Sequence, residues 1–358
     1  MTSPQRYISR RSAVLFMAGL GLAGTLAACG STPSTPEAST GASTTAAAGP
    51  VELTLVTYAV TQAAYEQIIP KFAEQWKAET GQEVTFNQSY GGSGSQTRAV
   101  LDGLEADVVA LALAGDTKKI EKGGLIEPGW ESEAPNNAIV HKSVAVLVTR
   151  EGNPKNIQGW EDLARDDVAV VTANPKTSGG AKWNFLGAWG FKTQTGSDDA
   201  AALDFVTKIY KNVPVLPKDA RESTDVFFTR GQGDVLINYE NEVILAAAKG
   251  EKLPFIVPDV NISIDNPVAV VDANVDKHGT REVAEAFVEF LFTPEAQEEF
   301  AKVGFRPVDP TVGEKFADQF PKIETLFTIA DLGGWEAIDK KFFADGAIFD
   351  QVQAKIGK

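Results

Sequence analysis

Residues 174–183 combine residue types whose order suits the binding of a small anion. A proline-containing turn leads into Ser178, Gly179 and Gly180, and the residues that follow are apolar at helical spacing. Serine is a favoured N-cap residue, and two glycines leave backbone N–H groups open where a larger side chain would block access. These N–H groups and the positive end of the helix dipole then point toward one place. The segment therefore predicts an oxyanion site at the start of a helix.

A second glycine-rich segment, residues 90–95, contains Ser93. Ser93 and Ser178 offer an alternative interpretation in which one of them is an enzyme's nucleophile. The Gly-Gly-Ser-Gly-Ser around Ser93 differs from the Gly-x-Ser-x-Gly of a hydrolase, and neither serine has a histidine near enough in sequence to suggest a base. His141 and His278 are far apart and are expected at the surface, so no metal site is predicted. We therefore predict a binding protein and not an enzyme.

The elements that must hold these turns alternate between strand and helix. Residues 51–56 alternate polar and apolar side chains like a half-buried strand, whereas residues 107–113 are continuously apolar like a strand covered on both faces. Further strands are expected at 84–88, 143–150, 168–172, 235–239 and 267–271, and helices at 63–80, 97–104 and 281–292. This alternation predicts an α/β fold with a parallel or mixed sheet, whose ligands bind beyond the carboxyl ends of the strands. The two glycine-rich turns follow strands and are expected there.

The amino terminus has the features of an exported lipoprotein. Three arginines and no acidic residue accompany the apolar residues 12–28, which predicts a signal peptide over residues 1–28. Leu-Ala-Ala-Cys at residues 26–29 resembles a lipobox, in which Cys29 receives a lipid after cleavage. The polar, low-complexity residues 30–50 cannot bury a core and are expected to form a flexible tether, so that 29–50 attaches the protein to the outer face of the cell membrane. Ser9-Arg10-Arg11 leaves the choice between general and twin-arginine export open.

Length and charge limit the remaining chain. Residues 51–358 suffice for two domains of about 150 residues each. Without the arginines of the signal peptide, the chain has 30 basic and 48 acidic residues and a formal net charge of −18. Such a charge repels nucleic acid, and no nucleic-acid partner is expected. With Cys29 as its one cysteine, the chain has no internal disulfide. We expect a monomer.

The run at 174–182 resembles the Asn-Pro-Lys-(Ser/Thr)-Ser-Gly-x-Ala-Arg signature of the bacterial sulfate- and thiosulfate-binding proteins of ABC transporters. It departs only at Lys182, where the family usually has arginine. Segments 88–94, 105–113, 183–190, 233–242 and 343–346 also resemble the family, in its order. The resemblance implies a two-lobed type II periplasmic-binding fold with two hinge crossings, near residues 135–150 and 260–270. Lobe one would comprise residues 51–135 and 268–358, and lobe two residues 136–267.

The resemblance also implies where the anion binds. The family's sulfate-binding positions correspond here to Ala59, Ser93, Ser178, Gly179, Gly180, Ala220 and Tyr239. Backbone N–H groups and the Ser178 hydroxyl would be the donors, and no cofactor is implied. Two positions depart from the family: Ala59 replaces the aspartate of a Ser-Tyr-Asp segment, and Tyr239 replaces a tryptophan whose indole N–H is a donor.

The chemistry of such a site leaves three ligand classes open. A lining of donors suits sulfate, because phosphate carries a proton near neutral pH and needs an acceptor; the Tyr239 hydroxyl can both donate and accept and could relax this selectivity. Thiosulfate or another oxyanion, such as molybdate, is an alternative. The net acidity and the aromatic residues Tyr58, Trp183, Trp189 and Tyr239 would instead suit a polyamine or ferric ion. We expect sulfate or thiosulfate as the ligand and the membrane permease of an ABC importer as the partner.

Overall fold

The structure, a computed structural model, describes residues 49–251 and 253–357 and forms one compact unit from Gly49 onward. The predicted signal peptide, Cys29 and most of the predicted tether lie outside the described residues. No helix in the described ranges is long and apolar enough to cross a membrane. The same ranges contain no group of three or more His, Cys, Asp or Glu side chains that could hold a metal ion.

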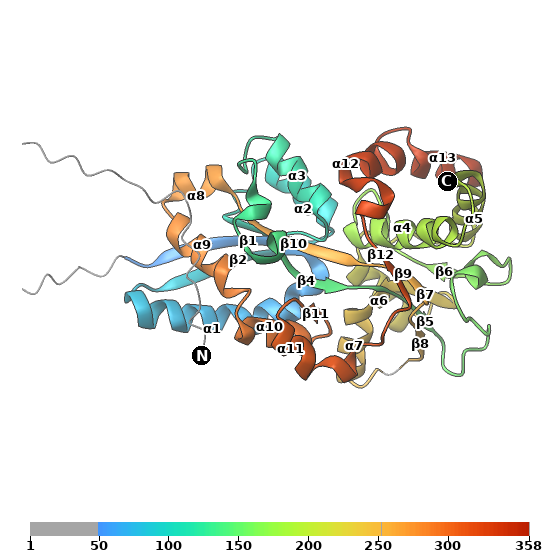
Figure 1. Ribbon diagram of the computed structural model, residues 1–358, viewed down its shortest axis with the longest axis horizontal. Helices are drawn as coiled ribbons and strands as arrows, with labels where there is room; N and C mark the ends of the chain where they lie inside the picture. The colour runs from blue at the N-terminus through green and yellow to red at the C-terminus, as the bar shows by residue number, and fades with distance from the viewer. Residues whose placement is uncertain (1–48, 252, 358) are drawn as a thin grey trace, which may run out of the picture. The chain divides into compact units, whose positions relative to one another are not determined.

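Strands and helices alternate through most of the unit (Figure 1). The strands are β1 (Val51–Tyr58), β2 (Val84–Gly91), β3 (Val108–Ala110), β4 (Ile139–Ser143), β5 (Ala145–Thr149), β6 (Val170–Val171), β7 (Val235–Tyr239), β8 (Phe255–Ile256), β9 (Val260–Ile262), β10 (Ile264–Val270), β11 (Arg306–Pro307) and β12 (Thr325–Phe327). The α-helices are α1 (Gln62–Thr80), α2 (Ser93–Leu101), α3 (Ala114–Lys122), α4 (Gly179–Gln194), α5 (Asp199–Lys211), α6 (Ala220–Phe228), α7 (Glu240–Ala248), α8 (Asp272–His278), α9 (Arg281–Phe290), α10 (Pro294–Lys302), α11 (Pro310–Lys315), α12 (Gly334–Ile338) and α13 (Ile348–Ile356).

The strands form two mixed sheets and one small pair. A six-stranded sheet has the order β11-β4-β10-β3-β1-β2, a four-stranded sheet has the order β6-β7-β5-β8, and β12 pairs with β9. In the six-stranded sheet β1 runs parallel to β2 and β3, whereas β10 is antiparallel to β3 and β4. The mixed α/β sheets expected from the sequence are therefore present, although the strand expected at 107–113 has ladder pairing only over β3.

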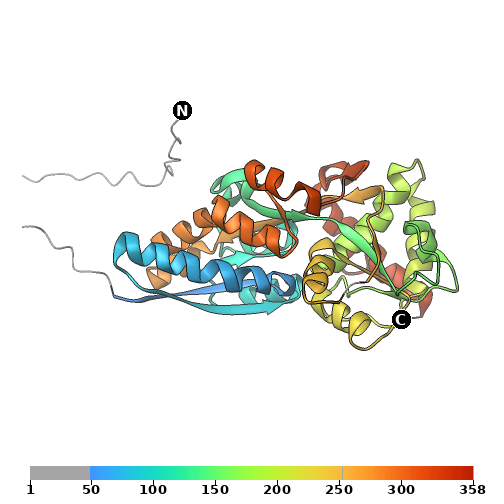
Figure 2. The same ribbon diagram turned by 90° about the horizontal axis from the view of Figure 1, so that it is seen from below.

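Alternation along β1 places helices on both faces of the six-stranded sheet. Leu55 belongs to the core cluster that contains Phe72 of α1 and Phe287 of α9, whereas Val56 belongs to the cluster that contains Val100 of α2. This division follows from the period of two in a strand. Figures 1 and 2 show the consequence, with α1, α9 and α10 on one face and α2 and α3 on the other.

The four-stranded sheet is layered in the same way. Val146 and Val148 of β5 pack with Val226 of α6 and Val243 of α7. Leu147, which points to the opposite face, belongs to the cluster that includes the buried residues of α4 and α5. Both faces are covered, which explains why the segment that becomes β5 reads as continuously apolar.

The chain leaves and re-enters the six-stranded sheet at two short junctions. Val144 alone separates β4 of the six-stranded sheet from β5 of the four-stranded sheet, and Ser263 alone separates β9, which pairs with β12, from β10 of the six-stranded sheet. Figure 1 shows β4 and β10 along the part of the molecule that joins the two sheets. Both junctions fall within the ranges where hinge crossings are predicted.

A third passage, between β11 and β12, brings the carboxyl-terminal segment back to the helices of the four-stranded sheet. Phe342 lies 4.9 Å from Trp189 of α4, centroid to centroid, and Phe349 of α13 lies 6.1 Å from Phe185. Figure 1 shows α13 beside α5. This packing differs from the expectation that residues 268–358 belong together in lobe one. The physical reason is the burial of these aromatic rings, whose partners cannot be read from the segment itself.

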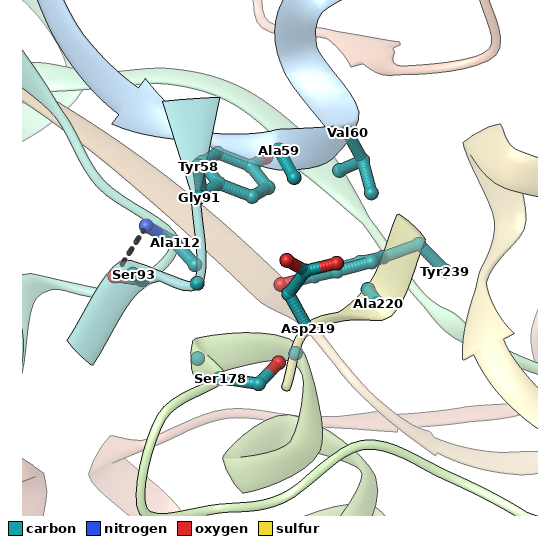
Figure 3. A pocket seen from close by; sticks show the side chains of 13 residues that line it. Tyr58, Ala59, Val60, Gly91, Ser93, Ala112, Ser178, Asp219, Ala220 and Tyr239 are labelled. Carbon is teal, nitrogen blue, oxygen red and sulfur yellow. Dashed lines mark hydrogen bonds between the residues drawn. The ribbon is translucent and has the colours of Figure 1, made fainter. Parts of the chain in front are cut away.

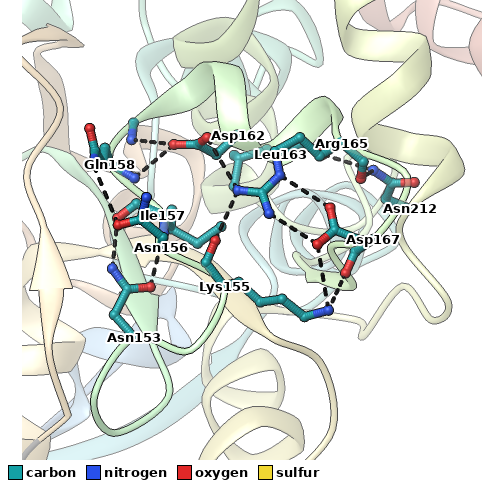
Figure 4. Close-up of polar contacts among 11 residues, drawn as sticks. Asn153, Lys155, Asn156, Ile157, Gln158, Asp162, Leu163, Arg165, Asp167 and Asn212 are labelled. Carbon is teal, nitrogen blue, oxygen red and sulfur yellow. Dashed lines mark hydrogen bonds and ion pairs between the residues drawn. The ribbon is translucent and has the colours of Figure 1, made fainter.

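The connection between β5 and β6 is held by polar contacts that fix the start of β6 (Figure 4). The Arg165 guanidinium binds both carboxylate oxygens of Asp167, at 3.1 and 3.0 Å, and the carbonyl of Lys155. Asn153 accepts a hydrogen bond from the Ile157 N–H and donates one to the Ile157 carbonyl. Because β6 leads directly into residues 174–178, these contacts help to position the glycine-rich turn that follows it.

The expectation for His141 is wrong. His141 is 1% exposed and lies in β4, with ring centroids 4.1 Å from Phe305 and 4.6 Å from Phe300. Burial lowers the pKa of His141 to about 3, so the ring is neutral near pH 7. The lysine beside it in sequence suggested exposure, but alternate residues of a strand face opposite sides.

Candidate functional site

All seven positions expected at the site line one small cavity (Figure 3). The cavity is lined by Tyr58, Ala59, Val60, Gly91, Gly92, Ser93, Ala112, Ser178, Gly179, Gly180, Asp219, Ala220 and Tyr239. The first seven of these residues belong to the elements of the six-stranded sheet, and the last six to those of the four-stranded sheet. The space inside it, about 10 Å³, has room for about one water-sized group and is far smaller than the roughly 300–1,000 Å³ of pockets for drug-sized ligands. It suits a small ion.

Five helices begin at the cavity. One is the 3₁₀ turn that leads into α1, and its N-cap is Tyr58. The other four are α2, α4, α6 and α7, whose N-caps are Gly92, Ser178, Asp219 and Tyr239 in that order. The first N–H groups of a helix have no intrahelical acceptor and carry the positive end of its dipole. Five such ends around one small cavity favour a negative charge there.

Several of these N–H groups have no other partner. Among the residues that the structure describes, no acceptor is found for the backbone N–H groups of Ser93, Gly179, Gly180 and Ala220. Each belongs to the first or second residue of its helix. Buried N–H groups are nearly always paired in proteins, so these four groups are donors available to a ligand.

The glycines permit a close approach of the backbone around the cavity. A Cβ on Gly92 would lie 2.4 Å from the Thr177 carbonyl oxygen, and a Cβ on Gly179 would lie 2.6 Å from Ala112 Cβ. In each pair, one residue belongs to the elements of the six-stranded sheet and the other to the elements of the four-stranded sheet. Any side chain at either position would hold these helix starts apart.

The two serine hydroxyls have different surroundings. Ser178 Oγ accepts a hydrogen bond of 3.2 Å from the Ala181 N–H, as an N-cap does, and its own proton remains available for donation. Ser93 Oγ donates to Asp116 Oδ2 at 2.8 Å and accepts from the Ala112 N–H at 3.1 Å. The Ser93 hydroxyl is therefore occupied, and its backbone N–H is the group that faces a ligand.

Tyr239 lies against the glycine turn. Its ring is so near Gly180 that a Cβ there would lie 2.7 Å from Tyr239 Cε2, and its hydroxyl has no hydrogen-bond partner among the described residues. The Tyr58 hydroxyl is likewise buried without a partner. Burial, and then the charges of Asp116 and Glu242, raise the pKa of Tyr239, so its hydroxyl stays protonated and can donate.

An ion pair of two buried side chains lies behind the cavity. Lys182 Nζ of α4 is 3.1 Å from Asp116 Oδ1 of α3. Burial acts to raise the pKa of Asp116, but Lys182, Lys119 and the Ser93 hydroxyl together hold it below its usual value. Asp116 is therefore ionised, and it fixes Ser93 at the start of α2.

The comparisons with known proteins agree with this geometry. Residues 53–306 match the family described as bacterial extracellular solute-binding protein. The chain belongs to this family. The sulfate-binding protein of Synechococcus elongatus (strain ATCC 33912 / PCC 7942 / FACHB-805) is 65% identical over 333 residues, which cover 93% of each chain. That of Escherichia coli (strain K12) is 45% identical over 318 residues, 88% of this chain and 96% of the relative.

A solved structure supports the same assignment. The sulfate-binding protein SubI from Mycobacterium tuberculosis H37Rv is 40% identical and superposes with a TM-score of 0.75 over 82% of this chain and 99% of that one. The α/β periplasmic-binding fold predicted from the sequence is thereby confirmed. So is the conclusion that this solute-binding protein is not an enzyme, because the family is not enzymatic.

The sequence interpretation of this solute-binding protein missed Asp219. Its carboxylate lines the cavity and accepts a hydrogen bond of 2.8 Å from the Glu222 N–H as the N-cap of α6. A signal was present, since an aspartate followed three residues later by a glutamate is typical of a helix start. Val60, Gly91, Gly92 and Ala112 were also not predicted individually.

Proposed function

We propose that this solute-binding protein captures sulfate or thiosulfate in the cavity between its two sheets and delivers it to an ABC importer. The observation that carries the proposal is the convergence of five helix starts on one small cavity whose lining contains no lysine or arginine among the described residues. Its relatives named sulfate-binding proteins, at up to 65% identity, support the same ligand class.

The energetics favour such a site. Burying a dianion is costly unless its oxygens are fully hydrogen-bonded, and each hydrogen bond to a charged group contributes about 1.5–3 kcal/mol. The donors we assign are the N–H groups of Ala59, Ser93, Gly179, Gly180 and Ala220, with the hydroxyls of Ser178 and Tyr239. Together they offset a desolvation cost of many kcal/mol, with the helix dipoles contributing further.

The proposal is tested by calorimetry on the protein from Gly49 onward, which is one compact unit. Sulfate and thiosulfate are titrated in separate experiments, with spermidine as the representative of the cationic alternative. One-to-one binding of at least one of the two anions, without a response to spermidine, is expected. Absence of any response to both anions at millimolar concentration would refute the proposal.

We infer that ligand capture closes two lobes about the junctions at Val144 and Ser263. One lobe comprises the six-stranded sheet with its helices. The other comprises the four-stranded sheet, its helices and the returning segment from β12 to α13, which revises the boundaries expected from the sequence. Small-angle scattering of the desalted protein with and without sulfate tests this motion, and a smaller radius of gyration with sulfate is expected. An unchanged profile at saturating sulfate would argue against closure.

We further propose that the mature protein is anchored outside the cytoplasmic membrane through a lipid on Cys29, with residues 30–50 as its tether. The basis is the sequence of residues 1–50 alone. The full chain is expected to incorporate labelled palmitate and to fractionate with membranes. Cys29→Ala should lose both properties, and the neighbouring control Ser31→Ala should keep both. Labelled Cys29→Ala protein would contradict the anchor.

A further inference from the structure

The indole of Trp183 makes a buried hydrogen bond between the two lobes. Its Nε1–H donates to the Ala112 carbonyl at 2.8 Å, and Trp183 is fully buried. Trp183 belongs to α4 of the four-stranded lobe, whereas Ala112 follows β3 of the six-stranded sheet. The same carbonyl accepts a second hydrogen bond, also of 2.8 Å, from Asn266 on β10 of its own lobe. Opening of the lobes would separate Trp183 from Ala112 and leave Asn266 in place, so the Trp183 bond belongs to the closed form.

This bond holds the part of α4 that carries anion donors. Trp183 lies one helical turn after Gly179 and Gly180, whose N–H groups begin α4. Ala112 lines the cavity, and a Cβ on Gly179 would lie 2.6 Å from Ala112 Cβ. The Ala112 N–H donates to Ser93 Oγ, which fixes Ala112 in its own lobe. The Trp183 bond therefore fixes the first turn of α4 against the opposite wall of the cavity.

The returning carboxyl-terminal segment packs over this bond. Trp335 of α12 lies edge-on to Trp183, with ring centroids 4.9 Å apart. Trp335 also contacts α3 of the other lobe, since a Cβ on Gly115 would lie 3.0 Å from Trp335 Cε3, and Figure 1 shows α12 beside α3. Asp339, four residues later, pairs with Lys119 of α3 at 3.0 Å. A segment that packs with the four-stranded lobe therefore also contacts the lobe opposite.

We propose that Trp183 and Trp335 form a clasp that holds the closed form and sets the rate at which the bound anion is released. Trp183 does not line the cavity, so it is a positioning residue that acts through Ala112 and the start of α4. The clasp forms only once the lobes have closed, so its loss speeds release and leaves association unchanged. This inference rests on the proposed function, and it goes beyond it because it names the side chains that control release.

Two tryptophans with the same kind of hydrogen bond allow a matched comparison. Trp183→Phe keeps an aromatic ring and removes the indole N–H that joins the lobes. Trp160→Phe is the control, because Trp160 is 1% exposed and donates its indole N–H to the Val260 carbonyl at 3.0 Å. That bond stays within one lobe, since β9, which contains Val260, pairs with β12.

The dissociation rate is measured as the release of radiolabelled sulfate, or thiosulfate if that is the anion bound, into an excess of unlabelled anion. Calorimetry gives the dissociation constant and hence the association rate. Trp183→Phe is expected to raise the dissociation rate by about 2- to 13-fold, the loss of one neutral hydrogen bond, with the association rate unchanged. Trp160→Phe should keep both rates and should lower the melting temperature equally with and without the anion.

Tryptophan emission provides a second readout. Because closure buries Trp183, the change in emission on adding the anion should be smaller in Trp183→Phe than in Trp160→Phe. Gly115→Leu tests the clasp from the other lobe, where the new side chain would displace Trp335. Leucine is a better helix former than glycine, so this variant should release the anion faster without melting earlier in its absence.

Wild-type release rates in both Trp183→Phe and Gly115→Leu would overturn the clasp and leave the proposed function intact. So would an equal rise in the dissociation rate in Trp183→Phe and Trp160→Phe, because the effect would then come from general loss of packing. If Trp183→Phe does not fold, the release rate of Gly115→Leu decides alone. A wild type that binds neither anion would refute the proposed function together with the clasp.

Discussion

Lys182 of α4 and Asp116 of α3 form an ion pair of 3.1 Å in which both side chains are almost fully buried. The two helices belong to the elements of different sheets, so the pair joins them directly behind the cavity. Asp116 also accepts a hydrogen bond of 2.8 Å from the Ser93 hydroxyl. Asp116 therefore links the start of α2, through Ser93, to the first turn of α4, through Lys182.

We predict that Lys182→Met weakens sulfate binding. The substitution leaves Asp116 ionised and buried, which typically costs about 3–5 kcal/mol, with the low end expected because Ser93 and Lys119 still approach the carboxylate. We expect this cost mainly in the ligand-bound form with its lobes closed, so sulfate affinity should drop by about 100-fold. The melting temperature of the ligand-free protein should change less. Calorimetry and thermal melting measure the two effects.

Lys182→Arg, which restores the residue usual in the family, is the control and should keep the affinity. The double variant Lys182→Met with Asp116→Leu should recover part of the loss, because an apolar pair can replace a buried ion pair. Equal affinity in Lys182→Met and the wild type would mean that the pair does not stabilise closure.

Gly179→Ala is predicted to weaken sulfate binding at least about tenfold. A Cβ at this position would lie 2.6 Å from Ala112 Cβ and 3.0 Å from Ser93 Cβ, so the start of α4 must move away from the other side of the cavity. The free energy of unfolding should change little, because alanine is a good helix former. Gly313→Ala in α11, where a Cβ would have no neighbour within 4 Å, is the control. A tight-binding Gly179→Ala protein would show that the two sides need not approach this closely.

Much of the site could be predicted because its signals are local. Ser178 followed by two glycines at a helix start, and Ser93 in a glycine-rich turn, are motifs that a few adjacent residues define. That both turns meet at one cavity followed from the rule that strands of an α/β fold end at a common edge. The resemblance to a family then added Ala59, Ala220 and Tyr239, whose sequence surroundings are unremarkable.

The features that were missed depend on residues far apart in the chain. Asp219 reads as a helix cap, and only the folded chain shows that it also lines the cavity, together with Tyr58 and Tyr239. The Lys182–Asp116 pair joins residues 66 positions apart. In the same way, Phe342 gives no sign in the sequence that it packs on α4. Such contacts are set by the packing of whole elements, which periodicity does not specify.

His141 is predicted to make the protein less stable in acid. Its pKa is about 3 in the folded protein because of burial, against an ordinary value of 6.5. Below pH 6.5 the unfolded chain takes up a proton that the folded ring refuses, so this stability is present above that pH and is lost as the pH falls toward 3. The loss is at most about 1.4 kcal/mol per pH unit. Denaturant unfolding between pH 7.5 and pH 4.5 should show a shallower decline for His141→Asn.

His278→Asn provides the comparison of opposite sign. Hydrogen bonds to Glu105 and Asp107 raise the pKa of His278, so its contribution is present at low pH and is lost as the pH rises through the folded value. Removing His278 should therefore flatten the decline of stability above pH 6.5 and leave the acid side nearly unchanged. Identical pH profiles for both variants and the wild type would refute the assignment of either histidine.

Tyr239→Phe tests whether the tyrosine hydroxyl takes the place of the family's indole donor. The hydroxyl is buried, protonated and without a partner among the described residues, and a Cβ on Gly180 would lie 3.1 Å from its oxygen. Removing it should cost about 1.5–3 kcal/mol of sulfate binding, or 10- to 150-fold in the dissociation constant. Tyr239→Trp supplies a donor that cannot accept, so it should bind sulfate at least as well as Tyr239→Phe. It should also lower any affinity for arsenate, because the indole N–H cannot accept a hydrogen bond from a protonated anion. If Tyr239 only packs against Gly180, Tyr239→Phe should cost less than about 0.5 kcal/mol of sulfate binding. Equal sulfate and arsenate affinities in the wild type, Tyr239→Phe and Tyr239→Trp would remove Tyr239 from the set of donors.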